Sequence, residues 1–91
     1  LIFINYITIM SKIYEYLRSL ETHPDKLLLT SFVLYTHIIK NPNIVAREEL
    51  DYAREISNRF NGRFGIYYLE KTIELMEKNL TYLEIKDPGY D

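Results

Sequence analysis

The sequence contains no cysteine and no tryptophan, and it has only three glycines and three prolines in 91 residues. Without cysteine, disulfides, thiolate metal sites and cysteine nucleophiles are excluded. No apolar run approaches the roughly 18 residues that a membrane span requires, so we expect no membrane partner. A basic excess is also absent, because 11 Lys and Arg face 13 Asp and Glu. Nucleic-acid binding would therefore depend on a local gathering of charge.

Patterns that support catalysis are missing as well. The two histidines, His23 and His37, lie in different contexts, and neither forms a His-x-x-x-His or Glu-x-x-His spacing for a metal. The glycine-containing segment NGRFG lacks the lysine of a phosphate-binding loop. We therefore expect no enzyme, no cofactor and no metal site. A small enzyme would need a deep pocket that converges on His37.

What the sequence does contain is 47% hydrophobic residues, which suits one small globular domain over residues 10–91. Tyrosine is abundant, with nine Tyr against four Phe. A tyrosine ring buries apolar area while its hydroxyl needs water or a hydrogen bond, so tyrosines gather at half-buried surfaces and interfaces. The composition therefore predicts contact with a partner.

Residues 1–9 are mostly apolar and uncharged. Two interpretations remain open: an N-terminal arm that packs on the domain or on a second copy, or an upstream extension of a protein that begins at Met10. The segment lacks the basic leader and the cleavage site of a signal peptide. Together with the absence of cysteine, this favours a cytoplasmic protein.

Apolar spacing predicts four helices, and the breaks between them fall at prolines, asparagines and glycines. The expected helices cover residues 11–21, 24–40, 47–60 and 66–79. A stub of strand is expected at Ile44-Val45. Residues 81–86 alternate between apolar and polar side chains, which predicts a further strand, and Asp87-Pro88-Gly89 predicts a turn. Residues 80–91 would then form an incomplete β-hairpin.

The predicted helix over residues 24–40 is apolar around most of its circumference. A domain of this size can hardly cover such a helix alone, so we expect a homodimer. The expected interface residues are Tyr14, Leu17, Leu28, Phe32, Tyr35 and Ile39.

Charge is spread unevenly along the chain. No acidic residue lies between Glu55 and Glu70, whereas Arg59 and Arg63 lie in that stretch. Arginine and asparagine have side chains suited to phosphates and base edges. The connection between the third and fourth predicted helices is therefore the candidate site for DNA contact.

The segment from Glu49 to Ile85 resembles the DNA-binding half of PadR-like winged-helix regulators. It is also similar to small DNA-binding and segregation proteins of archaeal plasmids and viruses. The resemblance is carried by Leu50, Ala53 and Ile56, by Asn61-Gly62-Arg63, by Tyr67-Tyr68, and by Glu77-Lys78-Asn79-Leu80. Asn79 stands where the family has glycine, Gly62 lies later than in a strict helix-turn-helix, and the wing lacks its return strand.

The resemblance implies a mainly α, winged helix-turn-helix fold with its helix-turn-helix at residues 46–79. It also implies binding of a palindromic double-stranded DNA site by a homodimer, for transcription regulation or for plasmid partition with a partner protein. The expected DNA contacts are Arg54, Asn58, Arg59, Asn61, Arg63, Tyr67, Tyr68 and Lys71. The alternative is an all-helical module that binds only protein.

Overall fold

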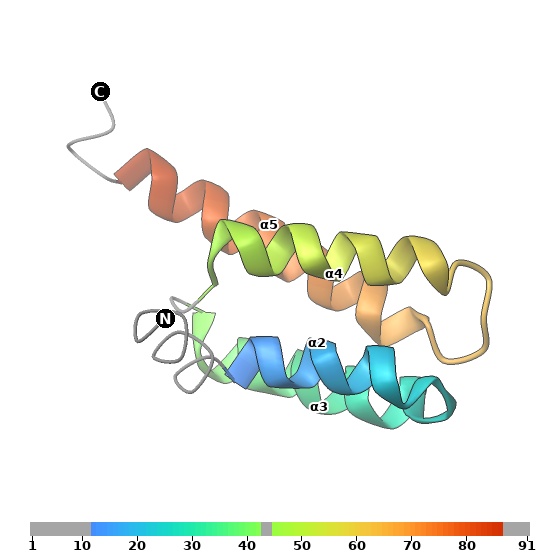
Figure 1. The fold of residues 1–91 in the computed structure, drawn as a ribbon. Coiled ribbons are helices and arrows are strands. Elements are labelled where there is room, and N and C mark those ends of the chain that lie inside the picture. Colours follow the sequence, from blue (N-terminus) through green and yellow to red (C-terminus); the bar gives the residue numbers. More distant parts are fainter. Residues whose placement is uncertain (1–11, 43–44, 87–91) are drawn as a thin grey trace, which may run out of the picture.

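The computed structural model describes residues 12–42 and 45–86, with side chains described as far as residue 80. This part of the chain is mainly helical (Figure 1). The elements are α2 (Lys12–Thr22), the short 3-10 helix η1 (Pro24–Lys26), α3 (Leu27–Lys40), α4 (Arg47–Arg59) and α5 (Tyr67–Lys86).

The four α-helices form two layers with a simple neighbour relationship. Helix α2 packs against α3 and α4, and α5 packs against the same two helices. Within the described residues, the backbones of α2 and α5 do not approach each other closely, and neither do those of α3 and α4. The chain therefore forms an α2–α3 hairpin and an α4–α5 hairpin. Figure 1 shows that the turns of both hairpins lie at the same end of the molecule.

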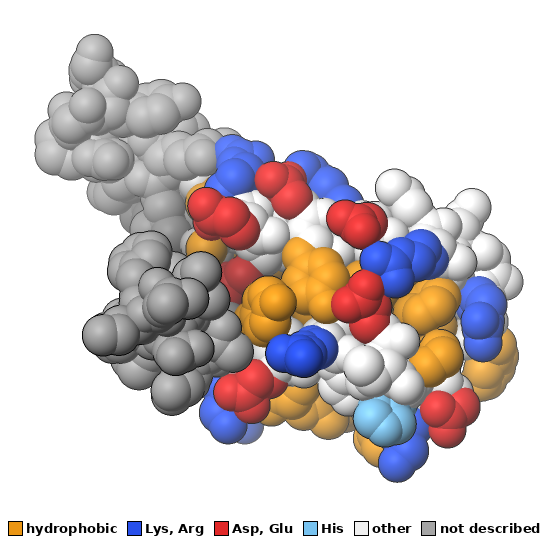
Figure 2. All heavy atoms as spheres, viewed as in Figure 1, with side chains coloured by type: hydrophobic (Ala, Val, Ile, Leu, Met, Phe, Trp, Pro, Cys, Tyr) orange, Lys and Arg blue, Asp and Glu red, His pale blue; other side chains and the backbone are white. Residues whose placement is uncertain are grey.

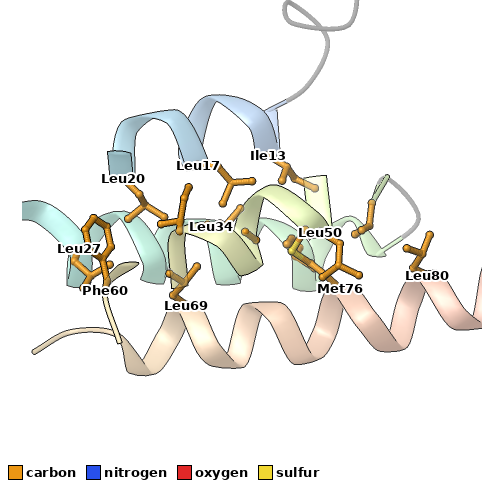
Figure 3. Packing of buried hydrophobic residues seen from close by; sticks show 14 residues of the cluster. Ile13, Leu17, Leu20, Leu27, Leu34, Leu50, Phe60, Leu69, Met76 and Leu80 are labelled. Carbon is orange, nitrogen blue, oxygen red and sulfur yellow. The ribbon is translucent and has the colours of Figure 1, made fainter. Parts of the chain in front are cut away.

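The core lies between these hairpins and follows the predicted helical spacing. All four helices supply it, and Figure 3 shows Leu20, Leu27 and Leu69 close together at one end. The buried hydrophobic residues are Ile13, Leu17, Leu20, Leu27, Leu34, Ile38, Val45, Leu50, Ala53, Ile56, Phe60, Leu69, Met76 and Leu80. The apolar stripes predicted for α2, α4 and α5 thus face inward.

Local chemistry explains where the helices begin and end. Pro24 opens η1, where its missing N–H has no helical partner to lose. At the start of α4, the Ala46 amide donates to Glu49 Oε1 at 2.9 Å, which satisfies a donor that the helix leaves open. After α4, Gly62 has a φ of +80° and turns the chain.

The strand predicted over residues 81–86 is wrong, because α5 continues through them to Lys86. Leu83, Glu84 and Lys86 are good helix formers, and extending an existing helix adds a hydrogen bond for each residue fixed. Val45 is also not in a strand and instead joins the core. The predicted arm over residues 1–9, Ile44 and the turn over residues 87–89 lie outside the described residues.

Gly65 allows the α4–α5 connection to lie directly against the beginning of α3. Its φ is +92°, and a Cβ added there would stand 3.0 Å from both the backbone nitrogen and the Cβ of Leu28. Gly62, in the same connection, has nothing within 4 Å of its would-be Cβ. The two glycines therefore share a positive φ but differ in their surroundings.

This difference predicts unequal effects of alanine. Gly62→Ala should cost about 1–2 kcal/mol of unfolding free energy, from backbone strain alone. Gly65→Ala should cost more, because the added methyl group also meets the Leu28 backbone. Urea denaturation followed by circular dichroism measures both. Equal losses in the two variants would show that the approach to Leu28 is not tightly constrained.

Candidate interaction surface

Arg54, an expected DNA contact, is paired with carboxylates of its own chain. Its Nη2 lies 2.7 Å from Glu77 Oε2, and its Nε donates to the same oxygen at 3.2 Å. Asp51 Oδ1 is a further neighbour, 3.6 Å from Nη1. This arrangement joins α4 to α5. Releasing Arg54 for a phosphate would break it.

Arg59 is held in a similar way. Its Nη2 lies 2.7 Å from Glu21 Oε2 and 3.0 Å from Glu55 Oε1. Because Glu21 belongs to α2, this contact joins α2 to α4. The positive charge predicted for the end of α4 is thus balanced by a carboxylate far away in the sequence.

Glu21 also accepts a short hydrogen bond from the Tyr52 hydroxyl. That bond, together with the Arg59 guanidinium, lowers the pKa of Glu21 below its usual value. Burial, followed by the hydrogen bond to Glu21, raises the pKa of Tyr52. The three side chains form one network between α2 and α4.

The remaining expected DNA contacts lie around the α4–α5 connection. Lys71 Nζ lies 3.7 Å from Glu74 Oε1 and 5.5 Å from the centre of the Tyr67 ring. Arg63 forms no ion pair with any described residue, and its guanidinium lies over the Phe60 ring at 5.4 Å. Asn58 and Asn61 are exposed. Three of the four expected cations are thus partnered by carboxylates, and Arg63 is the exception.

Figure 2 shows the consequence for the surface. On the visible face, basic and acidic side chains are interspersed over the helices rather than separated into patches. A face of this kind attracts a polyanion weakly, because anions lie among its cations.

Tyr67 and Tyr68 differ in their surroundings. Tyr67 is 57% exposed. Tyr68 is half-buried, and its ring packs against α3, with centroids 4.9 Å from Phe32 and 5.5 Å from Tyr35. Tyr68 therefore joins α5 to α3.

The residues expected at a dimer interface also differ in how exposed they are. Leu17 is fully buried in the core of its own chain, so it has no surface for a second copy. Tyr14 and Tyr35 are half-buried. Leu28, Phe32 and Ile39 are exposed, as expected for interface residues. Of these three, Leu28 and Phe32 lie together at one groove.

That groove lies between the beginning of α3 and the α4–α5 connection, and has a volume of about 750 Å³. Its apolar wall comes mainly from α3, and Phe64 of the connection stands at its rim with 91% of its surface exposed. The lining residues are Pro24, Asp25, Lys26, Leu27, Leu28, Leu29, Phe32, Arg63, Phe64 and Tyr68. In Figure 2, hydrophobic side chains are visible at the end of the molecule where this connection lies, and others lie in the middle of the same face.

Phe64 and Leu29 are the two most exposed apolar residues of this surface, and the sequence analysis missed both, as it also missed Asp25. Leu29 is 63% exposed, but a helix that is apolar almost all round gives no sign of which side remains outside. Phe64 did carry a signal. A large aromatic residue in a short connection between two glycines has little of its own chain to pack against.

None of the described helices is long and apolar enough to cross a membrane. In the same part of the chain, no group of three or more His, Asp or Glu side chains is arranged to hold a metal ion. Comparison with protein-family models, with curated proteins and with solved structures finds no match. The functional argument therefore depends on the surface itself.

The Tyr52–Glu21 contact generates a prediction on acid stability. Because the pKa of Glu21 is lowered in the folded state, its contribution is present above the unfolded-state pKa and is lost as pH falls through the folded-state value. Tyr52→Phe removes the largest cause of the shift. The pKa of Glu21 should then rise towards its usual value, and acid unfolding should begin at higher pH.

A carboxyl NMR titration measures the pKa of Glu21, and circular dichroism follows acid unfolding. Tyr67→Phe is the matched control, since its exposed ring is not part of the network. An unchanged Glu21 titration in Tyr52→Phe would contradict the assignment.

Proposed function

We propose that this chain is a helical protein-interaction module that binds another protein chain through the groove between α3 and the α4–α5 connection. The observation that carries the proposal is the contiguous apolar surface of Leu28, Leu29, Phe32 and Phe64, which lines one concave site. Scattered exposed hydrophobic residues are ordinary, but a contiguous patch beside a hollow marks a binding surface.

The energetics favour a protein occupant. Burying one large apolar side chain completely is worth about 1.5–3 kcal/mol, and Phe64 and Leu29 are mostly exposed. Aromatic residues, phenylalanine included, are enriched at protein interfaces relative to the rest of the surface. The groove also has polar groups at its edge, from Asp25, Lys26 and Arg63. An apolar centre with a polar rim is the usual anatomy of such a site.

Site-specific photo-crosslinking tests this function in the full chain. A benzoylphenylalanine at position 64 should give a protein adduct in cells, and adding Leu29→Asp should reduce the yield by about tenfold because it places a charge in the groove. The same probe at Ile39 is the control, since Ile39 is exposed on α3 but does not line the groove. No adduct from position 64, or equal adducts from both positions, would overturn the proposal.

DNA binding by a homodimer with a winged helix-turn-helix, for transcription regulation or partition-site binding, is the second candidate. One observation favours it: Arg63 lies in the exposed connection with Asn58 and Asn61 nearby in sequence, and no described carboxylate pairs with it. The carboxylate partners of Arg54, Arg59 and Lys71 count against it.

A salt series on a labelled duplex decides this second candidate. If DNA binds here, affinity should fall steeply with salt, and Arg63→Gln should lower the slope of log affinity against log salt by about 1, for one lost phosphate contact. Lys40→Gln, at the far end of α3, is the control. A slope that Arg63→Gln leaves unchanged would remove the α4–α5 connection as a DNA site.

A further inference from the structure

The groove and an exposed side chain that could fill such a groove, Phe64, lie on the same surface of one chain. The wall of the hollow comes from Leu28, Leu29 and Phe32, and Phe64 stands at its rim almost fully exposed. A twofold dimer needs a patch that is complementary to itself, with each copy giving what the other receives. A hollow beside an exposed aromatic side chain meets that requirement.

Phe64 does not fill the groove of its own chain, and the residue that follows it packs closely against α3. Gly65 brings the backbone of the connection against Leu28, so closely that a Cβ at this position would stand 3.0 Å from the Leu28 backbone nitrogen. The connection is therefore held at the edge of the hollow, and Phe64 makes little contact with its own chain. The ring is available to a second molecule.

The charges at the rim are self-complementary too. Asp25 and Lys26 lie on η1, and Arg63 lies on the α4–α5 connection. No described residue forms an ion pair with Asp25 or Arg63. A twofold axis that passes between Asp25 and Arg63 would place the aspartate of each copy opposite the arginine of the other, twice in one interface, with Lys26 next in sequence to each aspartate. A partner with a rim of one charge sign would meet a like charge at one of them.

We propose that the occupant of the groove is a second copy of this chain, with the Phe64 side chain of each copy seated in the groove of the other and Asp25 facing Arg63 across the axis. This inference rests on the protein-binding function proposed above and specifies its partner.

A charge exchange tests the arrangement. Asp25→Arg alone places two arginines opposite each other at both rim contacts, and Arg63→Asp alone places two aspartates there. Each variant should self-associate at least about tenfold more weakly than the unaltered chain. An equal mixture should form a 1:1 heterodimer, because both contacts then join opposite charges. Sedimentation equilibrium and native mass spectrometry measure the species.

Three results would overturn this dimer: a monomeric unaltered chain at about 100 µM, variants that self-associate as it does, or a mixture that stays monomeric. Phe64→Ser should abolish the dimer while Ile39→Ser keeps it, with thermal unfolding showing that both variants remain folded.

The crosslinked adduct at position 64 separates the two proposals. A mass of twice 10.9 kDa supports the second copy. A different protein mass overturns the dimer but leaves protein binding standing, and no adduct overturns both.

Discussion

The surface of this protein depends on the close approach of Gly65 to Leu28. Here the connection that closes the α4–α5 hairpin meets the beginning of α3, and a Cβ would lie 3.0 Å from the α3 backbone. That contact forms the groove, because α3 supplies its wall and the connection supplies its rim. Phe64, one residue earlier, lies outside the core with 91% of its surface exposed.

Charge has mainly a structural role in this chain. Arg54 joins α4 to α5 through Glu77, and Arg59 joins α4 to α2 through Glu21. Exposed pairs of this kind contribute little individually to stability, but they determine which charges remain for a partner. Because carboxylates of the same chain pair with these two arginines, the region near the α4–α5 connection carries little excess positive charge. Among the residues that line the groove, Asp25 and Arg63 form no ion pair with a described residue, and they lie beside exposed apolar area.

Helices and the inward stripes of α2, α4 and α5 could be predicted from the sequence, since 3.6-residue spacing is a local property of residues such as Ile13, Leu17 and Leu20. The end of α5 could not, because alternation over a few residues is compatible with a helix as well as with a strand, and a helix that already exists extends readily. The pairing of Arg59 with Glu21 could not be predicted from the sequence either. Nothing local connects two residues so far apart in the sequence, so the acid-free stretch suggested a free basic site.

The apolar residues of α3 lie in two places, the core and the groove. This division shows which exposed residues belong to the binding surface. Leu34 and Ile38 enter the core, whereas Leu28 and Phe32 reach the groove. Ile39 is about as exposed as these two, yet it does not line the groove. Exposure alone therefore does not distinguish a binding residue from an ordinary surface isoleucine. The distinction is contiguity: Phe32 shares the groove with Leu28 and Leu29, so a partner that covers Phe32 also removes water from those two residues, whereas Ile39 does not line the groove. A partner gains most where one contact removes water from several apolar side chains at once, and in the described part of α3 that place is its first two turns.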